Sequence, residues 1–290
     1  MHGDGDGWAE SDDGSRYWGR HGAAGLLLRA PAPGGGSAVL LQHRAAWSHQ
    51  GGTWALPGGA RDSHETTTHA AIREAGEEAG VSIEHVQVRA ERVTAHATSG
   101  PWTYTTVVAD ATTALATVPN GESTELRWVR EEQVTDLPLH PGFAASWPGL
   151  RATPVRLLLD TANVLGSRPD GWWRDRAGAT GRLLADLAAT LPRTIELPGG
   201  GFGWLPRVEA VLEGQAVDAV AVDARVPVHV ASGSGDDTLA DARSARSHSA
   251  TLTEVVAELT AVVTADRGLQ ARLPESVLRL APSTVLSWLG

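Results

Sequence analysis

The chain has 290 residues, of which 42% are hydrophobic and 20% charged, and this length predicts about two globular domains. It contains no cysteine, which excludes disulfides and cysteine-ligated zinc. The formal net charge of −10 argues against tight, non-specific binding to nucleic acid.

The N-terminal segment, residues 1–16, is acidic and rich in glycine. It has neither the basic start nor the apolar core of a signal peptide, so we expect a disordered lead-in. No apolar run in the chain approaches about 18 residues. We therefore expect no transmembrane helix and no membrane partner, with the cytoplasm as the default location.

A mixed α/β domain is predicted over residues 17–142, where apolar runs flank one helical stretch. The helix follows a loop rich in glycine and proline at 51–59. It is expected to begin among Thr66–Thr68, since threonine is a good N-cap, and to end near Ala79, before Gly80 as a natural C-cap. The expected strands are Ala23–Leu28, Ala38–Leu41, Val86–Val93, Thr103–Val108 and Leu126–Val129.

Residues 143–153 are predicted to be a linker, and residues 154–290 a second domain. In the second domain apolar runs alternate with helical stretches, which predicts an α/β fold with a mostly parallel sheet. The expected strands are Val155–Leu159, Val208–Leu212, Ala219–Val222, Val226–Val230, Ala261–Thr264 and Val277–Leu280. The expected helices are Trp172–Leu191 and Leu252–Leu259.

Three glutamates cluster on the helix of the first domain. Glu74, Glu77 and Glu78 are spaced i, i+3 and i+4, so their carboxylates share one helix face. Like charges this close repel each other and raise each other's pKa unless a cation compensates them. Because Mg²⁺ selects oxygen ligands of this kind, a divalent-cation site competes here with a plain solvated acidic face.

The spacing around these glutamates resembles the Nudix box: Gly59, five residues, Glu65, seven residues, then Arg73-Glu74-Ala75-Gly76-Glu77-Glu78. The resemblance covers roughly residues 17–142. It implies an α/β/α sandwich with a mixed sheet, and a hydrolase dependent on Mg²⁺ or Mn²⁺ that cuts the diphosphate bond of a nucleotide. It also implies that Glu74, Glu77 and Glu78 hold the metal with the Gly59 carbonyl, while Arg73 pairs with Glu65.

The general base and the nucleoside pocket are less well determined. Nudix enzymes often take the base from a later loop, where Glu122 and Glu125 are the candidates and plain loop charges the alternative. Aromatic side chains could stack on a base, with core or rim positions as the alternative for each. These side chains are His43, Trp54, Trp102 and Trp128.

Acidic residues also follow apolar runs in the second domain. They are Asp160, with Asn163 three residues later, then Asp236 and Asp237, then Asp266. Because the carboxyl ends of parallel strands converge, we expect these side chains to meet and to chelate Mg²⁺ or Mn²⁺. Turn and helix-cap roles are the alternative reading for such residues.

The pattern of the second domain resembles the NYN branch of the PIN-like nucleases over roughly residues 153–290. It implies an α/β/α domain, metal-dependent RNA cleavage and RNA as a partner, with Glu213 as a weaker candidate. The leading hypothesis is a nucleotide diphosphatase fused to such a domain. The alternative is a nucleotide-sensing regulator with a non-catalytic PIN-like docking domain. The sequence leaves open the substrate and the oligomeric state, a homo-oligomer included.

Overall fold

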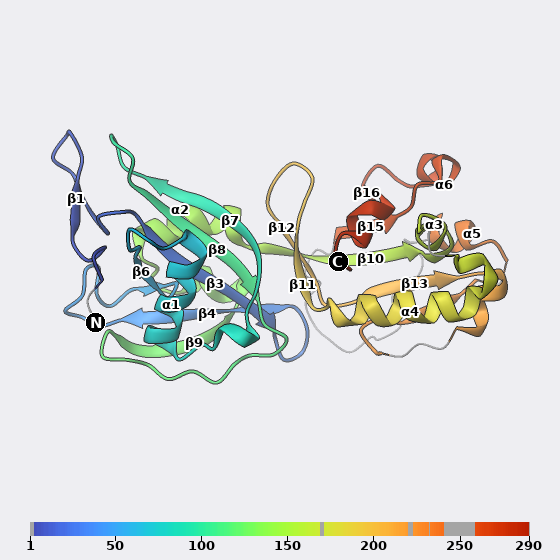
Figure 1. Cartoon of the computed structure of the whole chain (residues 1–290), viewed down its shortest axis with the longest axis horizontal. Coiled ribbons are helices and arrows are strands. Elements are labelled where there is room, and N and C mark those ends of the chain that lie inside the picture. Colours follow the sequence, from blue (N-terminus) through green and yellow to red (C-terminus); the bar gives the residue numbers. More distant parts are fainter. Residues whose placement is uncertain (1–2, 169–170, 220–222, 232, 241–258, 290) are drawn as a thin grey trace. The chain divides into compact units, whose positions relative to one another are not determined.

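The structure is a computed structural model that describes residues 3–168, 171–219, 223–231, 233–240 and 259–289. The chain divides into two compact units, which Figure 1 shows in sequence colours. The first comprises Met1–Ala152 and Thr194–Phe202, and the second Thr153–Arg193 and Gly203–Gly290. Within the described ranges, no helix has both the length and the apolar character needed to cross a membrane.

The first unit contains a mixed sheet in the order β5-β4-β3-β8-β7, with β6 beside β3 and β9 beside β4. Strand β3 runs parallel to β8 and antiparallel to β4, which confirms the predicted mixed sheet. The strands are β3 (Ala23–Pro31), β4 (Ser37–Arg44), β5 (Trp54–Ala55), β6 (Gly58–Ala60), β7 (Gln87–His96), β8 (Thr103–Asp110) and β9 (Ser123–Arg130). The helices are α1 (Thr67–Ala79), η1 (Ile83–His85), η2 (Glu131–Asp136) and α2 (Pro141–Leu150).

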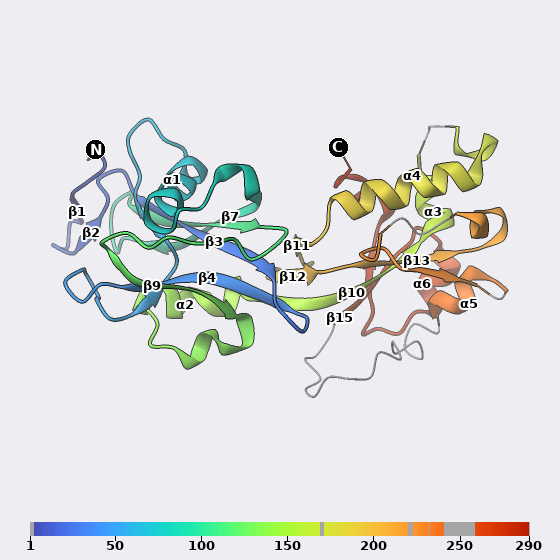
Figure 2. The ribbon, with the colours of Figure 1, turned by 90° about the horizontal axis from the view of Figure 1, so that it is seen from below.

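Helices α1 and α2 lie on opposite sides of this sheet (Figure 2). The inner face of α1 is made of alanines that are fully buried: Ala70, Ala71, Ala75 and Ala79. They pack with Leu26 and Leu28 of β3 in one core cluster. Because these side chains are small, the helix backbone can approach the sheet closely, which fixes the height of its glutamates above the neighbouring strands.

The N-terminal segment differs from the expected disordered lead-in. Strands β1 (Trp8–Glu10) and β2 (Arg16–Trp18) form an antiparallel hairpin in which Trp8 lies opposite Trp18. Tyr17 stacks on Trp102 at 4.7 Å between ring centroids, and the Trp102 indole donates a hydrogen bond to the Trp18 carbonyl. Strand pairing, ring stacking and this hydrogen bond therefore order a segment whose composition alone predicted disorder.

The predicted linker at 143–153 is also wrong over most of its length, because α2 occupies Pro141–Leu150 and β10 begins at Ala152. Phe143, Trp147 and Leu150 are buried against the first unit's core. His140 caps the helix, since its ring nitrogen accepts a hydrogen bond from the Gly142 amide at 3.1 Å. Proline and glycine suggested an exposed linker, but an apolar residue at about every fourth position gave the segment a face to bury.

A buried polar network in the first unit is centred on Arg29 of β3. The Arg29 side chain is fully buried and donates to Glu131 at 2.5 Å, to the Thr194 hydroxyl at 2.8 Å and to the Leu150 carbonyl at 3.0 Å. Both the amide and the hydroxyl of Thr194 donate to Asp110, at 2.7 and 2.6 Å. Thr194 therefore contributes to the first unit's interior although it comes from much later in the chain.

The sheet of the second unit has parallel strands in the order β14-β13-β10-β15-β16, with β12 and β11 also joined to β10, and the sequence predicted that it would be mostly parallel. Its strands are β10 (Ala152–Asp160), β13 (Val208–Leu212), β14 (Val228–Val230), β15 (Leu259–Val263) and β16 (Leu278–Leu280). Strands β11 (Arg193–Glu196) and β12 (Phe202–Leu205) form a hairpin. The strand order reverses beside β10, because β13 lies on one side of it and β15 on the other.

Helices flank both faces of this parallel sheet (Figure 2). They are α3 (Thr161–Gly166), η3 (Trp172–Arg174), α4 (Arg176–Ala189), η4 (Gly214–Asp218), α5 (Gly235–Ala240), α6 (Arg267–Arg272) and α7 (Pro282–Leu286). The single helix predicted over 172–191 is divided, because the Asp175 carboxylate accepts from the Gly178 amide at 2.9 Å and starts α4. Of the strand predicted at 219–222 and the helix predicted at 252–259, residues 220–222 and 252–258 lie outside the described ranges.

Candidate active site

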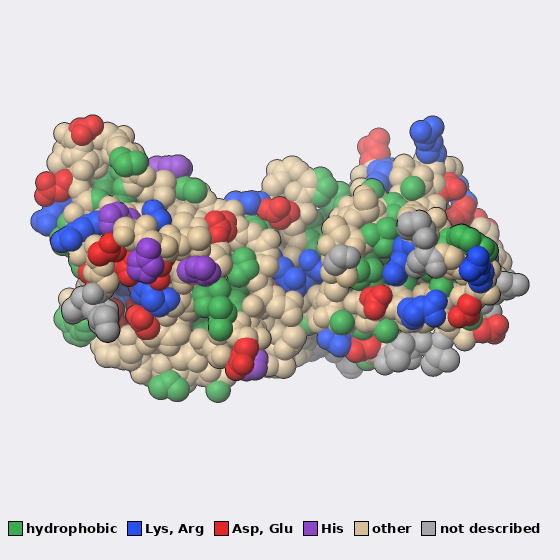
Figure 3. Space-filling model, viewed as in Figure 1, with side chains coloured by type: hydrophobic (Ala, Val, Ile, Leu, Met, Phe, Trp, Pro, Cys, Tyr) green, Lys and Arg blue, Asp and Glu red, His purple; other side chains and the backbone are tan. Residues whose placement is uncertain are grey.

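Helix α1 begins and ends where the sequence predicted. The Thr66 hydroxyl accepts a hydrogen bond from the His69 amide at 3.1 Å, and Gly80 ends the helix with φ of 69°. Figure 3 shows histidine and charged side chains gathered on the face of the first unit that carries α1. The glutamates of the Nudix-like motif project from the second half of this helix.

Arg73 joins the loop to the helix. Its guanidinium donates to both oxygens of Glu65, at 2.8 and 3.0 Å, and to the Ala60 carbonyl at 2.9 Å. A third nitrogen donates to Glu74 at 2.8 Å. The predicted pairing of Arg73 with Glu65 is thus present, and it places Glu74 beside the glycine turn that precedes the helix.

Glu78 is the most buried of the three glutamates, at 5% exposure. Its carboxylate accepts from the Gly58 amide at 2.7 Å and from the Gln42 side-chain amide at 3.1 Å. Gln42 is held in turn by the Ser123 hydroxyl at 2.7 Å. Sequence reasoning missed Gln42 and Ser123, because nothing in the spacing of β4 and β9 marks which polar residues face the helix.

The electrostatics of the two inner glutamates show a shared, poorly solvated site. Burial raises the pKa of Glu78 to about 8, and the charge of Glu74 adds to that rise. Burial also raises the pKa of Glu74 to about 7, although Arg73 opposes the shift. A divalent cation bound beside two such carboxylates stabilises their ionised forms, which burial and mutual repulsion otherwise disfavour.

The turn before the helix is shaped to admit an ion beside these oxygens. A Cβ on Gly59 would lie 2.6 Å from the Glu74 carboxyl carbon, so only glycine leaves that space open. A Cβ on Gly58 would lie 2.5 Å from the Ala24 carbonyl oxygen. The buried carboxylates of Glu74 and Glu78 beside this turn offer the oxygen ligands that a hard cation such as Mg²⁺ selects.

Glu77 stands further out than the other two. Its side chain is 62% exposed, and one oxygen lies 3.5 Å from an Arg73 nitrogen. It shares the helix face of Glu74 and Glu78 but not their burial. It therefore lies on the solvent side of these two carboxylates.

The two candidate bases are separated by the sheet. Glu122 lies in the turn before β9, and its charge adds to the raised pKa of Glu78, whose main cause is burial. Glu125 lies within β9 opposite His43, and its carboxylate accepts from Arg127 at 2.6 Å. Since neighbouring strand residues face opposite sides, Glu125 lies on the side away from Gln42 and Glu78. The loop placement expected for Glu125 is therefore wrong, and Glu122 is the better candidate.

The aromatic residues proposed for a base pocket have other surroundings. Trp54 is buried at 5% exposure beneath the Arg127 guanidinium and beside His43. Trp128 donates to the Leu115 carbonyl at 2.9 Å and packs against the core under α1, and Trp102 stacks on the N-terminal hairpin. The core reading, rather than the pocket reading, thus holds for Trp54 and Trp128.

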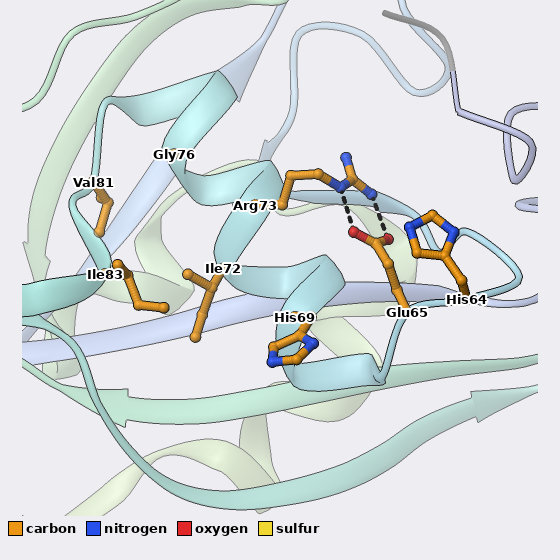
Figure 4. A pocket seen from close by; sticks show the side chains of 8 residues that line it. All are labelled: His64, Glu65, His69, Ile72, Arg73, Gly76, Val81 and Ile83. Atoms are coloured by element: carbon orange, nitrogen blue, oxygen red, sulfur yellow. Dashed lines mark hydrogen bonds and ion pairs between the residues drawn. The ribbon is translucent and has the colours of Figure 1, made fainter.

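A cavity of about 510 Å³ runs along the outer side of α1. Figure 4 shows the Arg73–Glu65 ion pair and His64 at one end and Ile72, Val81 and Ile83 at the other. Glu74, Glu77 and Glu78 do not line it. This groove therefore borders the bracing ion pair and not the carboxylates that fit a cation.

In the second unit, Asp160 and Asp266 cap helices α3 and α6, which is the alternative role that the sequence allowed, and hydrogen bonds link Asp160 to the segment after β15. Asp160, at the end of β10, accepts from the buried Thr264 hydroxyl at 2.7 Å and from the Asn163 amide at 3.1 Å. The Asn163 side chain accepts from the Ala265 amide at 2.8 Å, which joins β10 to the segment after β15. This is the place where the strand order reverses, as expected for a ligand site in a parallel sheet.

Three further acids act on this group through their charges. Burial raises the pKa of Asp160, and the charges of Asp236 and Glu213 add to the rise. Burial raises the pKa of Asp236 as well, followed by the charges of Asp266 and Glu213. Asp237 departs from the prediction, because its carboxylate turns to Arg272 at 2.5 Å on the exposed side of α5. Successive helical residues point about 100° apart, so Asp236 and Asp237 cannot both face the cluster.

Comparison with known proteins places the first unit among diphosphate hydrolases. The family model described as NUDIX domain matches residues 19–148. A Mycobacterium tuberculosis (strain H37Rv) protein named "Putative 8-oxo-dGTP diphosphatase 3" is 56% identical over 207 residues, covering 70% of this chain and 85% of that protein. A Bifidobacterium longum (strain NCC 2705) "Nucleoside triphosphate pyrophosphatase/Nudix hydrolase fusion protein" is 39% identical over 157 residues, covering 52% of this chain and 32% of that one.

Solved structures include one close in sequence. A Nudix hydrolase from M. smegmatis, RenU, is 68% identical, with a TM-score of 0.48, and the match covers 50% of this chain and 91% of that chain.

Proposed function

The chain belongs to the Nudix hydrolase family and is a nucleotide pyrophosphohydrolase, and from this premise we propose that its first unit hydrolyses nucleoside triphosphates with an oxidised purine base. The products are a nucleoside monophosphate and pyrophosphate. The observation that carries the proposal is the pair of buried, hard-to-ionise carboxylates, Glu74 and Glu78, beside the Gly58–Gly59 turn. The choice of substrate is supported by the name of the M. tuberculosis relative.

The residues of this unit have distinct tasks in that reaction. A bound Mg²⁺ supplies charge neutralisation of the diphosphate oxygens and an activated water. Glu74, Glu77, Glu78 and the Gly59 carbonyl would hold the cation, and Arg73, itself held by Glu65, positions Glu74. Glu122 is assigned as the proton acceptor. Arg44, whose charge opposes the burial-driven rise in the pKa of Glu78, is assigned to attract phosphate oxygens.

The first test of this function is a substrate screen. Full-length protein with Mg²⁺ should release pyrophosphate and monophosphate from 8-oxo-dGTP with a higher kcat/KM than from dGTP. Anion-exchange chromatography of the products measures both reactions, and omission of the metal is the control. Tight nucleotide binding with no product from any member of the panel would instead favour the nucleotide-sensing alternative.

A second activity is proposed for the second unit: metal-dependent cleavage of RNA by a PIN-like site. What supports it is that the charges of Asp236 and Glu213 add to the raised pKa of Asp160, and that of Asp266 to the raised pKa of Asp236, at the point where the parallel sheet reverses its strand order. Oxygen ligands from several strand ends are suited to Mg²⁺ or Mn²⁺. Asn163 holds two of the contributing segments together.

This second activity predicts a contrast between two neighbouring acids. Asp160→Asn should abolish Mn²⁺-dependent cleavage of a labelled single-stranded RNA, because it removes the innermost carboxylate. Asp237→Asn should cleave like wild type, because Asp237 faces Arg272 instead. Gel analysis of the RNA measures both variants. Cleavage that survives Asp160→Asn would show that this site is not responsible.

A further inference from the structure

Four rings form a row at one end of the first unit. Trp18 meets Trp8 at 5.4 Å between ring centroids, Trp8 meets His49 at 6.0 Å, and His49 meets His140 at 6.3 Å. We call these four the aromatic row. It joins three segments that are remote in sequence: the N-terminal hairpin, the loop between β4 and β5, and the start of α2.

The aromatic row is open to solvent, which is unusual for side chains of this size. Trp8 is 40% and Trp18 44% exposed, and His49 is exposed as well. Trp18 and His49 both meet Trp8 nearly at right angles, with interplanar angles of 79° and 77°. The rings therefore meet edge to face at the surface, and the Arg16 guanidinium lies over the Trp8 ring at 5.1 Å from its centroid.

The two middle members of the row, Trp8 and His49, belong to segments that contact the surroundings of the carboxylate site. Close to Trp8 in sequence, the Gly5 amide donates to Asp62 at 2.7 Å and the Asp4 carboxylate accepts from the Ser63 amide at 2.9 Å. Asp62 and Ser63 come directly after the turn that carries Gly59.

His49, the member of the row that lies in the loop between β4 and β5, is connected to the carboxylate site through Arg44. The Arg44 guanidinium donates to the His49 carbonyl at 3.1 Å. The charge of Arg44 also acts on Glu78, against the effect of burial on that carboxyl. Hydrogen bonds from the N-terminal segment and from the loop of His49 thus connect the row to segments next to the proposed metal site.

We infer that the aromatic row is the nucleobase subsite of this enzyme, where the purine of a nucleotide stacks on Trp8 and His49 while its phosphates lie at Glu74, Glu78 and Arg44. The inference rests on the proposed function, since it places the base of that substrate. His140, whose pKa is lowered by burial and by the neighbouring charge of Arg44, closes the row as a flat ring. A planar base is the ligand chemistry that exposed, mutually perpendicular rings accommodate, because it can stack on one ring and meet the edge of the next.

The inference is tested with Trp8→Ala in the full-length chain. KM for the nucleoside triphosphate should rise by about fivefold to a hundredfold, the range expected for loss of one base–aromatic stack. The Ki of inorganic tripolyphosphate, which has phosphates but no base, should stay unchanged. Trp8→Phe should recover most of the affinity, because it keeps a ring at the same place.

Trp47→Ala provides the matched control. Trp47 belongs to the same loop as His49 and is 72% exposed, and among the described residues it has no ring contact. It should leave KM at the wild-type value. Equal KM values for Trp8→Ala, Trp47→Ala and wild type would overturn the inference while the hydrolase function stands. A parallel loss of tripolyphosphate inhibition would also overturn it, because that result means that Trp8 only fastens the hairpin. A wild-type protein that hydrolyses no nucleotide refutes the proposed function itself.

Discussion

Replacing Glu78 with glutamine is expected to lower kcat/KM for the nucleotide by about a thousandfold while it raises the thermal stability of the metal-free protein. Removing a ligand charge forfeits several kcal/mol of charge stabilisation, and about 1.4 kcal/mol corresponds to a factor of ten. The fold should survive, because glutamine can still accept the Gly58 hydrogen bond that Glu78 accepts at 2.7 Å. Steady-state kinetics and thermal melts measure the two effects.

The stability change should depend on pH in a defined direction. Burial raises the pKa of Glu78 from 4.5 to about 8. Because this pKa is higher in the folded than in the unfolded state, the Glu78 carboxyl contributes fully to folding stability below about pH 4.5. That contribution is lost as the pH rises through about 8. Without metal, the melting temperature of wild type should therefore fall between pH 5 and 9 more steeply than that of Glu78→Gln. Added Mg²⁺ should raise the melting temperature of wild type most at the upper end of this pH range.

Glu84→Gln is the control for both measurements, because the Glu84 side chain is 73% exposed in η1 and takes no part in the site. It should keep wild-type turnover and wild-type pH dependence. Turnover near the wild-type level in Glu78→Gln would remove the metal-ligand assignment.

Replacing Glu131 with alanine is expected to destabilise the first unit by about 3–5 kcal/mol, the cost of leaving a buried charge without its partner. Arg29 is fully buried and donates to Glu131 at 2.5 Å. Glu131 also accepts from the Ser37 hydroxyl at 2.8 Å and the Ala152 amide at 2.6 Å, so three donors lose an acceptor at once. Hydrogen exchange of β3 and β4 amides, followed by mass spectrometry, measures the loss in this unit separately.

The neighbouring Glu132 offers a matched control. It pairs with Arg130 at 2.5 Å, the same separation, but its side chain is 44% exposed. Glu132→Ala should therefore cost no more than about 1 kcal/mol. Arg29→Leu combined with Glu131→Leu should lose less than the sum of the single changes, because no charge remains buried. Equal effects of Glu131→Ala and Glu132→Ala would contradict the buried-pair account.

Local rules predicted the helix of the carboxylate site well. Thr66 and Gly80 cap it as expected, and the i, i+3, i+4 spacing of Glu74, Glu77 and Glu78 fixed their common face. Pairing of Arg73 with Glu65 followed from the resemblance to the Nudix box and is present in the structure. What the spacing could not give was the degree of burial, which separates Glu78 from the exposed Glu77.

The predictions that were wrong concern long-range packing. The N-terminal segment and residues 143–153 were assigned by composition, yet Trp102 contacts the first segment and the buried Trp147 anchors the second. Glu125 was placed in a loop because the start of β9 was set too late. The partner of Arg29 lies 102 residues away, and no local pattern links such distant positions.

Because Thr194–Phe202 is counted with the first unit, the two halves of the chain are interleaved and not simply consecutive. During synthesis on the ribosome, Thr153–Arg193 leaves the exit tunnel before Thr194 can reach Asp110 and Arg29. The interior of the hydrolase is thus completed late, after part of its neighbour has already emerged. A gene fragment that stops at Ala152 encodes the whole catalytic motif but omits the Thr194 hydroxyl that bonds to Asp110 and Arg29. A fragment made to express the first unit should therefore extend beyond Phe202.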